Sequence, residues 1–158
     1  MTQLEDRVRH LFGVGIEAKI AAADTLSPVI ASAGLRLVNC LLNDGRIFLC
    51  GNGGSAANCM HFSVAMPNHF DVERPPLPVI TLSADVSILT ALINEGHSDQ
   101  VFARQIQALG QEGDVLLALS TSGNSDNVLH AVHAANDRGM DTVALSGRDG
   151  GVLANHLG

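Results

Sequence analysis

The sequence predicts an α/β protein with a parallel sheet that is covered by helices on both faces. From residue 46 onward, short apolar runs alternate with stretches of helical periodicity, which is the pattern of βαβ units. The chain has no Trp or Tyr and is rich in aliphatic residues, a composition typical of helices packed on a parallel sheet. Its 158 residues suffice for one domain with a substantial core.

The segment before residue 46 is predicted to form two helices, at about 3–42. Apolar side chains recur at helical spacing from Leu4 to Ile20. Ser27 and Pro28 suit the N-cap and first position of a second helix, because proline is favoured where no N–H is needed. We expect the apolar first helix to pack against another subunit.

The alternating part contains four expected strands, at 46–50, 79–82, 115–119 and 141–145. Helical stretches are expected at about 55–66, 85–94, 99–109 and 126–138. Only a short helical start, 152–157, follows the last strand. A further strand and helix would normally complete this unit, so we expect the sequence to be truncated relative to the natural protein.

Two Gly- and Ser-rich loops follow the first and third expected strands, and each opens a helix. They are Gly51–Ser55 and Ser120–Ser125. Helix N-termini carry unpaired N–H groups and partial positive charge, so they bind anions. Position 56 is Ala, which departs from Gly-x-Gly-x-x-Gly, and no Gly-Lys-Ser/Thr of a P-loop follows. The loops therefore predict a phosphate-bearing ligand other than a P-loop nucleotide.

Charge and cysteine content exclude several other classes. The formal net charge is −7 and no basic stripe is present, which argues against direct nucleic-acid binding. Three cysteines argue against a disulfide framework and favour a reducing cytosol. Because no signal peptide or apolar run of membrane-spanning length is evident, we expect a cytoplasmic protein without a membrane partner.

Several motifs together resemble the sugar isomerase (SIS) domain family, in its phosphoheptose isomerase branch. They are Gly-Asn-Gly-Gly-Ser-Ala-Ala-Asn at 51–58, His61-Phe62, Glu73-Arg74-Pro75, 113–117, 120–125 and Asp149-Gly150-Gly151. The resemblance implies a flavodoxin-like three-layer α/β/α sandwich, with one SIS domain over 1–158. It also implies a homotetramer with sites between subunits.

The same resemblance assigns a set of ligand-binding residues. Those expected to contact the sugar phosphate are Asn52, Gly53, Gly54 and Ser55. Those expected to hold its phosphate group are Ser120, Thr121, Ser122 and Ser125. Asn94 and Glu95 align with an Asn-Asp pair that lies at the ligand.

Position 65 separates two kinds of protein within this branch. In the isomerases, a Glu four residues after the His is a catalytic and zinc-binding group, whereas this chain has His61 followed by Ala65. A methyl group neither binds metal nor accepts a proton. The sequence therefore favours a non-catalytic regulator of replication initiation resembling the DnaA initiator-associating protein. Its expected partner is DnaA, and His61 is the remaining metal candidate.

The alternative is an enzyme that converts sedoheptulose 7-phosphate to heptose 7-phosphate for lipopolysaccharide synthesis, with zinc as a cofactor. Its base would come from elsewhere, such as Glu95 or a missing tail. A third reading is a phosphosugar sensor, in which the ligand tunes a partner interaction.

Three smaller features each have two readings. His130 and His133 are a metal pair or a solvated helix face, and the second is favoured. Cys50 and Cys59 are reactive thiols or buried packing residues, and again the second is favoured. Arg148 and Asp149 either contact a ligand or only form a turn.

Overall fold

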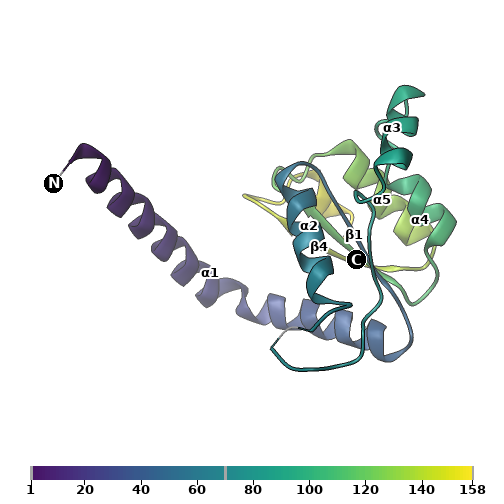
Figure 1. Ribbon diagram of the computed structural model, residues 1–158, viewed down its shortest axis with the longest axis horizontal. Coiled ribbons are helices and arrows are strands. Elements are labelled where there is room, and N and C mark those ends of the chain that lie inside the picture. The colour runs from purple at the N-terminus through teal and green to yellow at the C-terminus, as the bar shows by residue number, and fades with distance from the viewer. Residues whose placement is uncertain (1, 70, 158) are drawn as a thin grey trace. The chain divides into compact units, whose positions relative to one another are not determined.

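The computed structural model describes residues 2–69 and 71–157. Its centre is a four-stranded sheet in the order β2-β1-β3-β4, and every neighbouring pair is parallel. The strands are β1 (Ile47–Gly51), β2 (Val79–Thr81), β3 (Val115–Ser120) and β4 (Asp141–Ser146). Figure 1 shows helices following the strands along the chain. The predicted α/β fold with a parallel sheet is confirmed.

The remaining elements are helices. They are α1 (Gln3–Leu42), α2 (Gly54–Ala65), α3 (Val86–Asn94), α4 (Ala103–Leu109), α5 (Asp126–Asp137) and the 3-10 helix η1 (Val152–Asn155). The expected helix at 99–109 is shorter, because a turn in which the Gln100 N–H donates to the His97 carbonyl precedes it. By contacts the chain divides into two units, Met1–Arg36 and Leu37–Gly158.

The N-terminal segment is one continuous helix, so the prediction of two helices is wrong. Pro28 lies inside α1, where it lacks the N–H that would bond the preceding turn. The hydroxyls of Thr25 and Ser27 donate to the carbonyls of Ala21 and Ala23 in the turn before Pro28. Ser27 thus bonds within the helix instead of starting a new one.

The continuity of α1 also changes the expectation about membranes. By length and apolar composition alone, this helix is long enough to cross a bilayer, although interior helices of soluble proteins pass the same test. Most of its large apolar side chains are exposed in the single chain, among them Leu4, Phe12 and Leu42.

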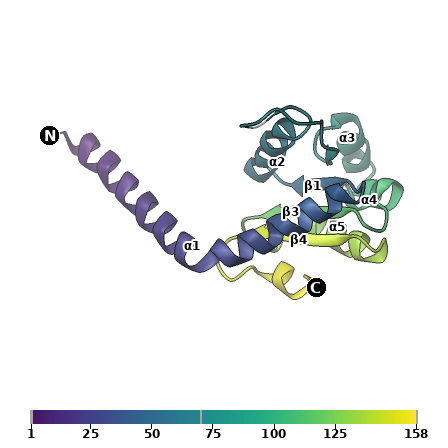
Figure 2. The same ribbon diagram turned by 90° about the horizontal axis from the view of Figure 1, so that it is seen from below.

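Figure 2 shows the strands β1, β3 and β4 in that order, and along each strand the side chains alternate between the two faces of the sheet. Phe48 and Leu116 belong to the main core cluster with Ile106 of α4 and Val128 of α5. Leu49 and Leu117 point to the other face, where they line a cavity together with Cys59 of α2. The sheet therefore separates α2 from α4 and α5, as the predicted sandwich requires.

Asp114 fixes the amino ends of β1 and β3. Its carboxylate accepts from the Arg46 backbone N–H at 2.8 Å, the Arg46 guanidinium at 3.0 Å and the Gln111 N–H at 3.0 Å. Its side chain is only 4% exposed, so its loss leaves buried donors unpaired.

We expect Asp114→Ala to lower the free energy of unfolding by about 2–4 kcal/mol. Urea unfolding followed by circular dichroism measures this change. The exposed Asp137→Ala is the control and should stay within about 0.5 kcal/mol of the parent protein. An equally small effect of Asp114→Ala would show that this carboxylate does not anchor the sheet.

Candidate functional site

The two Gly- and Ser-rich loops lie side by side at one edge of the sheet. We call residues 51–55 the first loop and residues 120–125 the second loop. They follow β1 and β3, which pair directly with Gly51 opposite Leu119. The chain proceeds from β1 to β2 on one side, while β3 lies on the other. This is a topological switch point, where open α/β sheets bind their ligands.

A pair of amides joins the two loop regions directly. The Asn52 side-chain NH₂ donates to the Asn127 oxygen at 2.8 Å, and the Asn127 NH₂ donates back to the Asn52 oxygen at 2.9 Å. Asn127 lies in the first turn of α5, immediately after the second loop. The reciprocal pair therefore holds the N-termini of α2 and α5 close enough for one ligand to meet both.

Both helices begin without a side-chain cap. Neither Gly53 before α2 nor Ser125 before α5 gives the first turn a side-chain hydrogen bond. By contrast, α3 follows β2 in the chain and has Asp85 as its N-cap, whose carboxylate accepts from the N–H groups of Ser87 and Ile88. The first turns of α2 and α5 thus keep N–H groups available to an anion, whereas the first turn of α3 already donates to the carboxylate of its own N-cap residue.

Hydroxyl groups gather on the second loop. Ser120 is 4% exposed, and its Oγ lies 3.2 Å from the Oγ of Ser125. The Ser122 Oγ accepts from the Asn124 N–H, and Thr121 is exposed. In the first loop, Asn52 and Gly53 precede α2, and Gly54 and Ser55 are its first residues. The structure thus brings eight of the ten predicted ligand residues to one edge.

Asn94 and Glu95 are not joined to these loops. They are the last residue and the C-cap of α3, and both are exposed. In the part of the chain that the structure describes, neither side chain has a hydrogen bond or ion pair with either loop. Their predicted role at the ligand remains a prediction.

A third loop, residues 147–151, supports the second loop from the end of β4. The Gly147 N–H donates to the Thr121 carbonyl, the Val152 N–H donates to the Asn124 side chain, and the Leu153 N–H donates to the Gly123 carbonyl. Within this loop the Asp149 carboxylate accepts from the Gly151 N–H, which is a turn role. Arg148 has φ 53° and is exposed.

Gly123 is required where the second and third loops meet. A Cβ at this position would lie 1.8 Å from the Gly150 carbonyl oxygen, and its φ of +66° also disfavours a side chain. We expect Gly123→Ala to lower the free energy of unfolding by about 2–5 kcal/mol in urea titrations. Gly54→Ala, with open space at its Cβ, is the control for stability. If both variants unfolded like the parent protein, close packing of these loops would be refuted.

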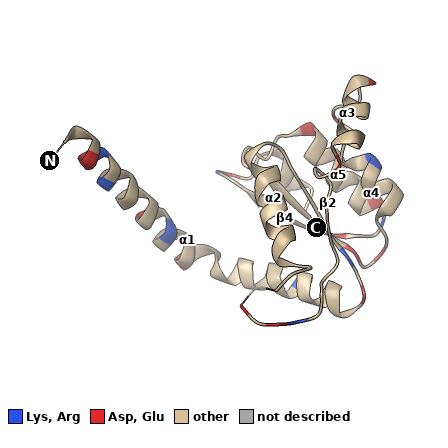
Figure 3. Cartoon of the chain, viewed as in Figure 1, with Lys and Arg blue, Asp and Glu red and all other residues tan. Residues whose placement is uncertain are grey.

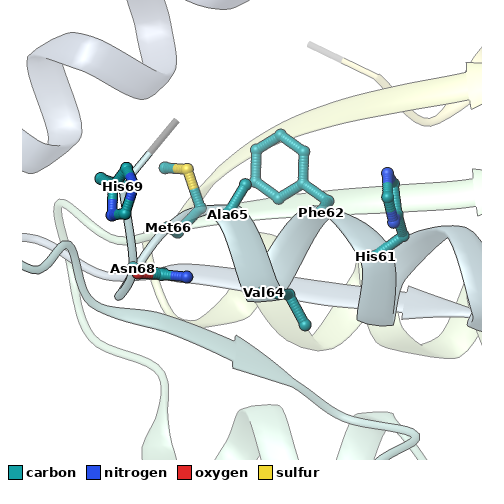
Figure 4. A pocket seen from close by; sticks show the side chains of 7 residues that line it. All are labelled: His61, Phe62, Val64, Ala65, Met66, Asn68 and His69. Carbon is teal, nitrogen blue, oxygen red and sulfur yellow. The ribbon is translucent and has the colours of Figure 1, made fainter. Parts of the chain in front are cut away.

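A cavity of about 500 Å³ lies beside the C-terminal half of α2 and the residues that follow it. Figure 4 shows His61 at one end of this cavity and His69 at the other, with Phe62 and Ala65 between them. The α2 helix has no Lys, Arg, Asp or Glu, and it is tan throughout Figure 3. Within the described lining, the two imidazoles are therefore the groups able to accept a proton.

The end of α2 beside this cavity is anchored by an arginine. The Arg74 guanidinium donates to the carbonyls of Ala65 and Met66, both at 2.7 Å. Such a contact satisfies carbonyls that a helix C-terminus leaves unpaired.

His130 and His133 pair with separate partners, and Cys50 and Cys59 pack in the interior. The His130 Nδ1 lies 3.2 Å from the Asp99 carboxylate, while His133 contacts a different partner, so the two do not form a metal pair. Cys50 and Cys59 are buried, and burial raises the pKa of the Cys59 thiol to about 11. The favoured reading of both thiols as packing residues is confirmed.

Sequence reasoning did not single out three residues at this edge. Asn127 was missed because an amide in a first helical turn is common, and only its pairing with Asn52 gives it importance. Thr81 is the last residue of β2 and Ser83 lies two residues beyond it, and their hydroxyls are buried without a partner among the described residues. The sequence offered one signal for these two residues, which is that small hydroxyl side chains also occur where β2 ends.

Comparison with known proteins agrees with the motifs read from the sequence. The SIS domain model matches residues 12–147. A phosphoheptose isomerase of Halorhodospira halophila is 54% identical over 152 residues, which are 96% of this chain and 77% of the relative. A phosphoheptose isomerase of Shewanella pealeana is 49% identical over the same shares.

Solved structures agree with these relatives. A phosphoheptose isomerase from Neisseria gonorrhoeae superposes with a TM-score of 0.92 at 44% identity, covering 99% of this chain and 82% of that one. One from Francisella tularensis gives a TM-score of 0.94 at 46% identity, covering 100% of this chain and 82% of that one.

These similarities overturn the prediction of a non-catalytic replication regulator. Relatives that match 96% of the chain are phosphoheptose isomerases, and so are the two superposed structures. The prediction gave the single change at Ala65 more weight than the rest of the sequence. An association with DnaA stays a prediction from the sequence alone.

Proposed function

Because the chain belongs to the SIS domain family, we propose that it is a phosphoheptose isomerase, which interconverts sedoheptulose 7-phosphate and heptose 7-phosphate. The observation that carries this proposal is the 54% identity to such an isomerase over 96% of the chain. The paired, uncapped helix N-termini at the switch point support a phosphorylated substrate. The eight loop residues from Asn52 to Ser55 and from Ser120 to Ser125 are the proposed phosphate and sugar contacts.

The length of α2 suits a substrate whose phosphate is far from its reacting carbons. Gly54 and His61 are seven residues apart, so they share one helix face at a separation of about 10 Å. In the substrate, C2 and C7 are joined by five C–C bonds of about 1.5 Å each. We propose that the 7-phosphate binds at the two loops while C1 and C2 lie near His61.

We propose His61 as the group that moves the proton. Aldose–ketose isomerisation removes a proton from one of two adjacent carbons and returns one to the other through an enediol. His61 lines the cavity, and its imidazole is able to accept and return this proton. Within one chain zinc has no complete set of ligands here, since the described residues contain no group of three His, Cys, Asp or Glu that could hold a metal ion.

The test is conversion of sedoheptulose 7-phosphate by the purified chain, with the aldose product identified by NMR. We expect turnover that falls at least about 10²-fold in His61→Gln. His69→Gln, at the far end of the same cavity, is the matched control and should stay within about threefold of the parent. Absence of any product would refute the isomerase, whereas an unchanged His61→Gln would refute only the role of His61.

We also propose that the protein is a homotetramer in the cytoplasm. The exposed apolar side chains of α1 support subunit contact, and the three free thiols suit a reducing compartment. Light scattering coupled to size exclusion measures the mass directly. We expect four chains for the parent protein, and Phe12→Asp should reduce the mass.

A further inference from the structure

The first and second loops do not balance the charge of a phosphate ligand. A sugar phosphate monoester carries about −1.5 to −2 charges at pH 7. The N-terminal ends of α2 and α5 each act as roughly half a positive charge, so together they match only about half of it. Neither loop contains Lys or Arg, α2 has no charged residue, and the first turn of α5 carries the acidic Asp126. A phosphate held here would be stabilised by a cation from another part of the chain.

The third loop is fixed against the second loop on both sides of Arg148. Before it, the Gly147 N–H donates to the Thr121 carbonyl at 3.2 Å. After it, the Gly150 carbonyl oxygen lies where a Cβ on Gly123 would be only 1.8 Å away. Consecutive Cα atoms are about 3.8 Å apart, and an extended arginine side chain reaches about 6 Å from its Cα. The Arg148 guanidinium can therefore reach a phosphate beside the second loop.

Arg148 is exposed, and its guanidinium has no hydrogen bond or ion pair within the described chain. The neighbouring Asp149 carboxylate does not pair with it and accepts from the Gly151 N–H instead. Three other arginines bond to the protein itself, and they are Arg46, Arg74 and Arg138. Arg148 is thus a cation at this edge of the sheet that is available to a ligand.

The backbone at Arg148 is unfavourable for an arginine. Its φ of 53° lies in the left-handed region, which side chains other than Asn and Asp seldom adopt. Glycine or asparagine would form the same turn with less strain. An arginine that holds this conformation without contacting its own protein favours a role toward a bound molecule.

We propose that Arg148 binds the substrate phosphate from the third loop and supplies the cation that the first and second loops lack. A planar guanidinium matches phosphate oxygens with two parallel N–H···O bonds. The contact rests on the proposed function, since it extends the phosphate site of those two loops. Because Arg148 would bind the phosphate and not the reacting carbons, its loss should change phosphate affinity and KM more than kcat.

Calorimetric titration of inorganic phosphate into the full chain tests this contact without turnover. We expect Arg148→Asn, whose new side chain suits the left-handed backbone, to bind phosphate at least about tenfold more weakly than the parent. It should melt at or above the melting temperature of the parent, because the strain is relieved. Arg148→Lys keeps the charge without the planar fork and should recover part of the affinity.

Arg104→Gln is the matched control for the loss of one positive charge. Arg104 is exposed on α4, and its guanidinium also lacks a hydrogen bond or ion pair among the described residues. It lies outside all three loops, so phosphate affinity in this variant should stay within about twofold of the parent.

Steady-state kinetics with sedoheptulose 7-phosphate give a second readout. The KM of Arg148→Asn should rise at least about tenfold at low ionic strength, while kcat stays within about threefold. This difference in KM should shrink as salt is added, because salt screens interactions between exposed charges. A merely structural role of Arg148 would not give this salt dependence.

The outcomes separate Arg148 from the isomerase activity. Unchanged phosphate affinity in folded Arg148→Asn, or an equal loss in Arg104→Gln, would overturn the contact. Isomerase turnover with the KM of the parent in Arg148→Asn would refute only the role of Arg148. Phosphate binding that depends on Arg148 in a chain that converts no sugar would refute the isomerase and leave the contact standing. A parent that neither binds phosphate nor converts the sugar would refute both.

Discussion

Ala65→Glu is expected to raise kcat for sedoheptulose 7-phosphate by about 10²–10⁴-fold, the contribution typical of a positioned general acid or base. Residue 65 lies one helical turn beyond His61 and lines the same cavity of about 500 Å³, which has room for the longer side chain. No residue of α2 is charged, so the new carboxylate meets no like charge on this helix. Steady-state kinetics of both proteins measure the change.

Two matched variants separate proton transfer from other effects of this substitution. Ala65→Gln has the same shape without the ionisable group and should leave kcat near that of the parent. Val64→Glu introduces the same charge on an exposed residue that lines the same cavity but points away from Ala65 (Figure 4), and it should also have little effect. An equal gain in all three variants, or no gain in Ala65→Glu, would show that a carboxylate at position 65 does not transfer protons to or from the reacting carbons.

Replacing both Ser120 and Ser122 by Ala is expected to lower kcat/KM by about 10²–10⁴-fold. Each hydroxyl is proposed to hold the phosphate, and hydrogen bonds to charged groups contribute about 1.5–3 kcal/mol each. Every 1.4 kcal/mol corresponds to a tenfold change in binding. Because the phosphate is remote from the carbons that react, we expect KM to rise more than kcat falls.

Ser63→Ala is the control for this double substitution. Ser63 is on α2, and its hydroxyl donates to the Met60 carbonyl, away from both loops. Because Ser120 is buried beside Ser125, thermal melting must show that the double variant is folded. Undiminished kcat/KM in a folded double variant would mean that the phosphate binds elsewhere.

The parallel sheet and the two loops were predictable from the sequence because both depend on local patterns. Apolar strands, glycines and hydroxyl residues around Gly51 and Ser120 need no distant partner to be recognised. The pairing of β1 with β3 then brought the loops together. The reciprocal contact of Asn52 with Asn127 was beyond prediction, since it joins residues 75 positions apart.

Two predictions failed because tertiary or global information outweighed a local signal. Ser27-Pro28 is a strong helix start, yet α1 continues through it while the hydroxyls of Thr25 and Ser27 bond to preceding carbonyls. Ala65 removed one expected chemical group, and that absence was taken to decide the function. Similarity across 96% of the chain carries more information than one position.

The most direct test of the central claim compares kcat/KM for sedoheptulose 7-phosphate with that for sedoheptulose, using one preparation of the full chain. The claim is that the first and second loops form one phosphate site that positions the sugar along α2. We expect turnover of the phosphorylated sugar with kcat/KM at least about 10³-fold higher, since remote binding energy orients the reacting carbons. Equal values for the two sugars, or turnover of neither, would contradict it.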